Sequence, residues 1–198
     1  MKNRLSALAL VVSLALVLAT PLSSQVSVFV GRLGLGTLVQ VGSGTATARP
    51  CGTVTTNATS ATTPANTTET DLWSYTLPAN TLTENGHALH IVAFGSFAAN
   101  ANGKTVRLYY GGTVISTHNS TSNGGGWYLR GTVMRTGASA QIAFGDAYGS
   151  AGTLVTTFAA PAASTTATTI IKATGQNGAL SADITFRGAI VECTGNPL

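Results

Sequence analysis

The stretch Asp71–Ile115 constrains the fold of this chain more than any other. It contains three short apolar segments, and turn signals separate them: Pro78-Ala79-Asn80, Asn85-Gly86, Asn102-Gly103 and Gly111-Gly112. Dipeptides such as Asn-Gly supply the positive φ angles that tight turns between strands require. Strands that recur at short intervals with such turns between them are typical of all-β sandwiches and barrels.

The rest of the C-terminal region continues the same pattern. Val106, Leu108 and Tyr110 alternate with Arg107 and Tyr109, as in a strand with one buried and one exposed face. The sequence contains no convincing amphipathic helix. We therefore predict an all-β, two-sheet antiparallel jelly-roll sandwich of about nine strands. The predicted strands are 72–76, 88–97, 104–110, 113–118, 126–135, 140–144, 154–158, 168–174 and 181–193.

Composition limits the partners of this chain. Only 8% of residues are charged, against roughly 25% in ordinary globular proteins, and threonine, serine, alanine and 23 glycines fill much of the sequence. Such a neutral, hydroxyl-rich surface suits a protein that is packed into an assembly or works outside the cell. The basic residues are scattered and form no run along a phosphate backbone, so we expect no nucleic-acid partner.

The N-terminus has the layout of a secretory signal peptide. Lys2 and Arg4 precede an apolar run at 5–19, and a small and polar segment follows at 20–25. This run is shorter than the roughly 20 apolar residues of a membrane span. An uncleaved membrane anchor and an apolar arm inserted into an assembly are the alternatives.

Three parts are predicted along the chain. Residues 1–25 are a signal peptide or apolar anchor, and residues 26–68 are an extended arm followed by a Thr-rich linker. The linker has little hydrophobic surface to bury. Residues 69–198 are the jelly-roll β-sandwich.

Two cysteines, Cys51 and Cys193, nearly bracket the β-rich region. In an exported chain such a pair suggests a disulfide, and the first and last strands of a closed sandwich are often neighbours. Two unpaired buried thiols are the alternative if the protein stays in a reducing compartment. Neither cysteine belongs to a Cys-x-x-Cys motif, and we expect no metal site and no cofactor.

The sequence offers no acid–base pair, activated nucleophile or metal cluster, and we predict that the protein is not an enzyme. Binding is easier to place, because loops on rigid β-scaffolds commonly carry recognition groups. Two predicted loops, 118–126 and 145–152, combine glycine and polar residues with occasional aromatics. The candidate ligand-binding residues in these loops are Asn119, Asn123, Asp146 and Tyr148.

Several motifs between residues 68 and 192 resemble a known domain. They are ETDLWSYTLPANTL at 69–82, Gly86-x-x-Leu89-x-Ile91-x-Ala93-x-Gly95, NANGKTVRL at 100–108 and Gly111-Gly112-Thr113, followed in order by Trp127, Arg135-Thr136-Gly137 and Gln141. The chain resembles a jelly-roll domain that recurs in tailed-phage virion proteins, especially tail-fibre and receptor-binding proteins. The resemblance implies a β-sandwich that assembles as a homotrimer, in the manner of tumour-necrosis-factor-like domains.

Two functions remain open from the sequence. The first is a non-enzymatic structural or receptor-binding module of a phage or prophage virion, with other virion proteins or a host-surface glycan as partners. The second is an exported bacterial β-sandwich protein that binds surface glycans. The expected location is therefore the virion or the cell exterior, with a membrane contact only through residues 5–19 if these are not cleaved.

Overall fold

The computed structural model describes residues 52–150, 152 and 154–195. Within them the chain forms strands and connecting loops, and no helix there is long and apolar enough to cross a membrane. The strands, in chain order, are β1 (Gly52–Asn57), β2 (Ala61–Thr62), β3 (Thr70–Leu77), β4 (Ala88–Phe97), β5 (Lys104–Tyr110), β6 (Thr113–Ser120), β7 (Gly125–Gly137), β8 (Ala140–Gly149), β9 (Leu154–Ala159), β10 (Thr169–Asn177) and β11 (Ile184–Thr194).

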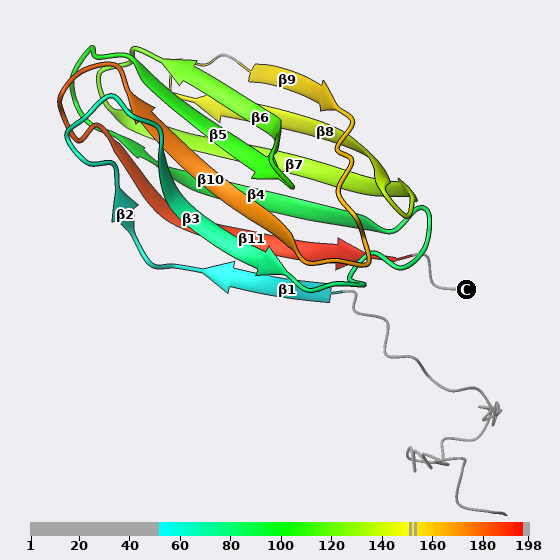
Figure 1. Ribbon diagram of the computed structural model, residues 1–198. Helices are drawn as coiled ribbons and strands as arrows, with labels where there is room; N and C mark the ends of the chain where they lie inside the picture. The colour runs from blue at the N-terminus through cyan, green and yellow to red at the C-terminus, as the bar shows by residue number, and fades with distance from the viewer. Residues whose placement is uncertain (1–51, 151, 153, 196–198) are drawn as a thin grey trace, which may run out of the picture. The chain divides into compact units, whose positions relative to one another are not determined.

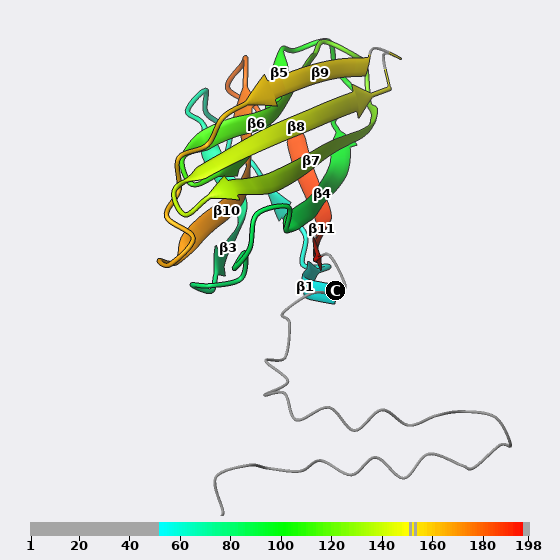
Figure 2. The ribbon, with the colours of Figure 1, turned by 90° about the vertical axis from the view of Figure 1, so that its right-hand side faces the viewer.

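These strands form two antiparallel sheets that pack face to face (Figure 1). One sheet has seven strands in the order β1-β11-β4-β7-β8-β9, with β2 also paired to β11. The other has four strands in the order β3-β10-β5-β6. Viewed from the side, β9, β8 and β7 lie next to one another along the larger sheet (Figure 2).

The pairing order is that of a jelly roll. The chain folds as one long hairpin with nested pairs, β1 with β11, β3 with β10, β4 with β7 and β5 with β6. Rolling up such a hairpin distributes successive pairs over two sheets, which closes most of the sandwich. The hairpin β8–β9 extends the larger sheet beyond β7. The predicted fold class, an all-β two-sheet antiparallel jelly-roll sandwich, is confirmed, while its expected N-terminal apolar segment lies outside the described residues.

Strand alternation supplies the core between the sheets. On β5, Val106, Leu108 and Tyr110 are buried, and on β4 Leu89 and Ile91 are buried from the other sheet. Aromatic rings from both sheets also meet there. The rings of Trp73 and Phe186, for example, stack with centroids 6.2 Å apart.

The sandwich begins earlier in the chain than the sequence predicts. Part of the predicted Thr-rich linker forms β1 and β2, which pair with β11 along one side of the larger sheet. Threonine is β-branched and fits a half-exposed strand, so a Thr-rich segment can complete a sheet edge although it has little apolar surface. The predicted segment 1–25 and residues 26–51 of the predicted segment 26–68 lie outside the described residues.

Candidate ligand-binding site

The outer face of the four-stranded sheet carries a continuous set of polar side chains. On β5 the outward residues are Thr105, Arg107 and Tyr109, because the alternate positions fill the core. Cross-strand register places Arg107 beside Thr174 of β10 and Tyr109 beside Lys172. Alternation and register together therefore align hydrogen-bonding groups from several strands on one surface.

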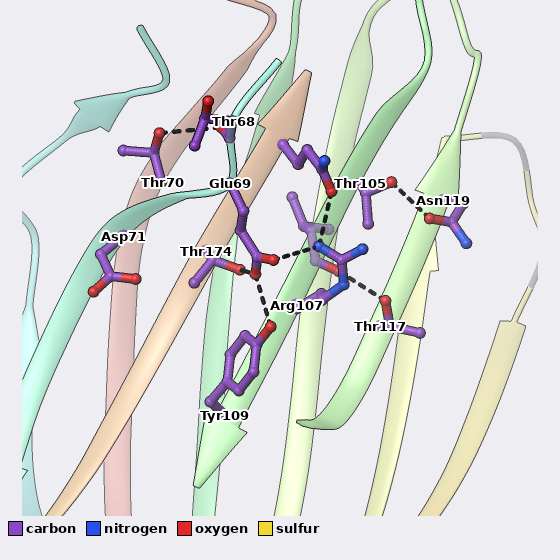
Figure 3. A network of polar contacts seen from close by, with 12 residues as sticks. Thr68, Glu69, Thr70, Asp71, Thr105, Arg107, Tyr109, Thr117, Asn119 and Thr174 are labelled. Atoms are coloured by element: carbon purple, nitrogen blue, oxygen red, sulfur yellow. Dashed lines mark hydrogen bonds and ion pairs between the residues drawn. The ribbon is translucent and has the colours of Figure 1, made fainter. Parts of the chain in front are cut away.

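Glu69, just before β3, is the centre of this surface (Figure 3). One carboxylate oxygen lies 2.9 Å from Nη1 of Arg107. The other accepts hydrogen bonds from the hydroxyls of Tyr109, at 2.8 Å, and Thr174. Arg107 in turn donates to the side-chain oxygen of Gln176 at 3.1 Å. The network fixes the orientation of groups from three different strand regions.

This network shifts the pKa values of Glu69 and Tyr109 in opposite directions. Burial by itself would raise the pKa of Glu69, but hydrogen bonds from Thr174 and Tyr109, together with the charge of Arg107, lower it below the ordinary value of 4.5. Burial and the neighbouring Glu69 carboxylate raise the pKa of Tyr109. Glu69 is therefore ionised and Tyr109 protonated at neutral pH, which keeps the phenol as a hydrogen-bond donor.

A second ion pair lies on the same face. Nζ of Lys172 lies 2.8 Å from a carboxylate oxygen of Asp71. The same ammonium lies 5.2 Å from the centre of the Tyr109 ring, within the range of a cation–π contact. Positive and negative groups thus alternate across the face, which carries no large field of one sign.

An open pocket of about 530 Å³ adjoins the network at the end of the sheet where β5 begins and β10 ends. Its polar lining includes Thr105, Asn119, Gln176 and Asn177. Asn119 accepts a hydrogen bond from Thr105 at 2.7 Å across β5 and β6. A shallow pocket lined with amide and hydroxyl groups is suited to a ligand that both donates and accepts hydrogen bonds.

Two buried charged residues brace the loops behind this pocket. Lys104 is only 1% exposed, and its Nζ donates to the carbonyls of Asn100, Asn102 and Ser122 at 2.7, 2.9 and 3.3 Å. Asp183 accepts hydrogen bonds from Ser181, Asn100 and Asn102 at 2.6 to 2.9 Å. Burial alone would raise the pKa of Asp183, but these hydrogen bonds lower it below the ordinary value. Satisfied charges of this kind hold the loop backbone in one arrangement.

The predicted ligand-binding residues do not form one site. Asn119 lines the pocket, and Asn123 is exposed in the loop between β6 and β7. Asp146 and Tyr148 instead lie on the other sheet, in β8, where Tyr148 stacks on Tyr128 with centroids 5.9 Å apart. The structure thus places Asn119 on one sheet, Asp146 and Tyr148 on the other, and Asn123 in a loop.

The predicted loop at 145–152 is for the most part strand. The glycines that suggested a turn, Gly145 and Gly149, serve close packing between the sheets instead. A Cβ atom at Gly145 would lie 1.7 Å from the carbonyl oxygen of Ile115, and one at Gly149 would lie 2.3 Å from Nε2 of His118. Glycine inside a strand often marks such an approach of backbone to a neighbour.

Sequence patterns alone did not identify Glu69, Thr174 and Gln176 as site residues. Arg107 and Tyr109 were visible as the outward positions of a strand, but their partners come from regions more than 35 residues away along the chain. Strand register decides which of these residues meet, and a single sequence does not contain it.

The two cysteines are only partly described. Cys193 is buried on β11, and Cys51 lies outside the described residues. Gly52, which follows Cys51 in the chain, is the register partner of Cys193. The predicted disulfide stays a prediction.

The described residues contain no group of three or more His, Cys, Asp or Glu side chains able to hold a metal ion. The acids of the polar face, Glu69 and Asp71, are each engaged by a basic side chain. What this arrangement offers to a ligand is a set of oriented hydrogen-bond donors and acceptors on a rigid sheet.

Comparison with known proteins adds little information about the function of this chain. No protein-family model matches this chain, and no curated protein matches it. Among solved structures, it is similar to the CBM2 module of the evolved Dit of Lactobacillus casei BL23 phage J-1. The two chains share 14% sequence identity, with a TM-score of 0.35, over 63% of this chain and 70% of that chain. A likeness this weak carries no inference about function.

Proposed function

We propose that this protein is a non-enzymatic structural and receptor-binding module of a phage or prophage virion, and that it recognises a host-surface glycan. The glycan binds to the polar face of the four-stranded sheet and to the pocket beside it. The virion assignment rests on the resemblance of residues 68–192 to jelly-roll domains of tailed-phage virion proteins. The same resemblance supports a tumour-necrosis-factor-like homotrimer and other virion proteins as partners.

The observation that carries the glycan proposal is the network around Glu69. It presents an arginine, a tyrosine hydroxyl and the Gln176 amide next to an open pocket, where Asn119, bonded to Thr105, adds a second amide. These groups are held by hydrogen bonds before any ligand arrives. Sugars expose many hydroxyls, each of which donates and accepts hydrogen bonds. Groups that are already oriented on a rigid scaffold lose little conformational entropy on binding, which favours recognition of such ligands.

An exported bacterial β-sandwich protein that binds surface glycans is the second candidate. The signal-peptide layout of residues 1–25 favours it. Mass measurement of the protein from purified particles and from culture supernatant separates the two functions. An intact N-terminus inside particles supports the virion module, and a secreted product that lacks about the first 24 residues supports the exported protein.

The glycan site is tested by binding of the full chain to a glycan array and to host cells. The variant Asn119→Ala/Gln176→Ala removes two amides at the pocket and should weaken binding at least tenfold. The control is Asn85→Ala, at an exposed asparagine in the turn before β4. Surface changes of this kind usually alter stability by no more than about 0.5 kcal/mol, so folding should persist in both variants. Equal binding by the double variant and the wild type would show that recognition occurs elsewhere.

A further inference from the structure

Exposed large apolar side chains concentrate on the outer face of the seven-stranded sheet. We call this surface the aromatic face. Its members are Phe94 on β4, Met134 on β7, Ile142, Phe144 and Tyr148 on β8, Leu154 and Phe158 on β9, and Ile190 on β11. Phe158 is 81% exposed. A side chain of this size and polarity is costly to leave in water.

Strand register joins these residues into one surface. Phe94 is paired with Tyr128, Tyr128 with Tyr148, and Tyr148 with Leu154, so one row crosses four strands. Four residues further along these strands, Phe144 is paired with Phe158, and their ring centroids are 5.1 Å apart. Residues paired across strands have neighbouring side chains, so the apolar residues lie in rows on one face. The row between them consists of Arg130, Asp146 and Thr156.

The charges within the aromatic face neutralise each other. Nε of Arg130 lies 2.8 Å from a carboxylate oxygen of Asp146, which is only 3% exposed between the aromatic pairs. Arg187 and Glu192, of opposite sign, lie on β11, on the side of the sheet away from β9. Two copies that meet through this face would therefore bring together no unbalanced charge.

We propose that the aromatic face is an interface between copies of this chain. The eight exposed apolar side chains offer roughly 700 Å² of surface, taking about 150 to 250 Å² for a fully exposed large side chain. This area is close to the roughly 800 Å² that each partner buries in a standard-size interface, and it exceeds the largest apolar patch of most monomeric proteins. The same surface on a second copy is equally apolar and equally neutral, and packing of the two gives a two-fold contact, distinct from the three-fold contacts of the proposed homotrimer.

The composition of the face favours a protein partner over a sugar. Recognition of a sugar needs hydrogen-bonding groups beside an open ring face. Here the ring faces of Tyr128 and Tyr148 pack on each other, and their cross-strand neighbours are Phe94 and Leu154. The nearby Arg130 and Asp146 are already engaged with each other. Burying such apolar side chains against another apolar surface removes them from water, which stabilises the contact.

The test is the mass of the full chain in solution by size-exclusion chromatography with light scattering. The wild type should be an oligomer at micromolar concentration. Phe158→Glu and Ile142→Glu place charges on the aromatic face, and each should raise the dissociation constant at least tenfold. The control is Leu180→Glu, at a side chain that is 79% exposed between β10 and β11, away from the face, and it should leave the mass unchanged. Circular dichroism checks that each variant is folded.

Three results would overturn the proposal: a monomeric wild type, an oligomer that survives both substitutions on the face, or equal dissociation by Leu180→Glu. Binding of a monomeric wild type to lipid vesicles or to cellulose would assign the face to a membrane or a polysaccharide instead. The result is independent of the glycan site on the opposite sheet. Folded Phe158→Glu should bind a monovalent glycan as the wild type does, so failure of one proposal leaves the other standing.

Discussion

The two outer faces of this sandwich follow from the same strand alternation and carry opposite chemistry. Outward positions of the four-stranded sheet hold Glu69, Arg107 and Lys172 in hydrogen-bonded pairs. Those of the seven-stranded sheet hold mostly Phe, Tyr, Ile and Leu side chains, with the Arg130–Asp146 pair among them. Polar groups in fixed positions favour ligands whose hydrogen-bonding groups match their directions. An apolar face has no such directional preference, and its binding free energy grows with the apolar area that is buried. The two proposed binding surfaces therefore lie on separate faces of one sandwich.

The ion pairs of the two faces show the same difference. Glu69 has two hydroxyl donors in addition to Arg107, and the pair lies next to the pocket. Asp146 is almost completely buried among aromatic side chains and pairs with Arg130. The first pair holds the groups of the proposed glycan site in place, and the second neutralises a carboxylate within a largely apolar surface.

The largest predicted effect on stability comes from a disulfide on the sheet that carries the aromatic face. A disulfide between Cys51 and Cys193 would close a loop of about 140 residues and stabilise the oxidised protein by about 5 kcal/mol in the chain-entropy model. The other sheet has no cysteine to form such a link. Mass measurement after thiol blocking, with and without reductant, detects the bond, and urea unfolding of Cys51→Ser gives its contribution. Two freely alkylated thiols in native exported protein would contradict the prediction.

The next effect concerns the support of the polar face. Lys104→Met leaves three loop carbonyls without the ammonium that they share, and we expect a loss of about 3 kcal/mol in the free energy of unfolding. Urea unfolding measures it. The control is Lys172→Met on the outer surface of the same sheet, where the loss should stay within about 1 kcal/mol. Equal losses would mean that Lys104 does not brace the loops.

Sequence patterns predicted much of the fold, because the alternation of apolar and polar residues within each strand is visible in the sequence. The predicted strands 88–97 and 104–110 agree with β4 and β5, and Arg107 and Tyr109 point outward as expected. Alternation also placed the buried residues of β5. These features depend only on neighbours along the chain, so a single sequence contains them.

The two proposed binding surfaces were harder to predict, because they depend on pairing between distant strands. The sequence placed Asp146 and Tyr148 in a loop, since glycines flank them, whereas those glycines allow the sheets to approach each other. The aromatic face was missed for a related reason. Phe94, Phe144 and Phe158 are isolated outward residues in the sequence, and only register brings them onto one surface.

A smaller, pH-dependent effect comes from the interior between the two faces. His118 is buried on β6, its ring nitrogens have no hydrogen-bond partner among the described residues, and burial lowers its pKa below 6.5. The unfolded chain therefore takes up a proton more readily than the folded one as the pH falls below about 6.5, and stability decreases through that range. His118→Leu should remove this decrease. Urea unfolding at pH 7.5 and pH 5 tests it, and an unchanged difference between the two pH values would contradict it.

The smallest effect separates stability from recognition on the polar face. Because the pKa of Glu69 is lowered, its ion pair contributes stability above about pH 4.5, and this contribution is lost as the pH falls through the lowered pKa. Glu69→Gln should lower the free energy of unfolding by about 1 kcal/mol at pH 7 and flatten its dependence on pH below 4.5.

The matched control is Asp71→Asn, which breaks the more exposed pair with Lys172 and should lower the free energy of unfolding by less. Glycan binding should fall much more in Glu69→Gln than in Asp71→Asn, since Glu69, unlike Asp71, bonds directly to both Arg107 and Tyr109 beside the pocket. Equal loss of binding in both variants would mean that the charge of the face matters and the geometry of the network does not.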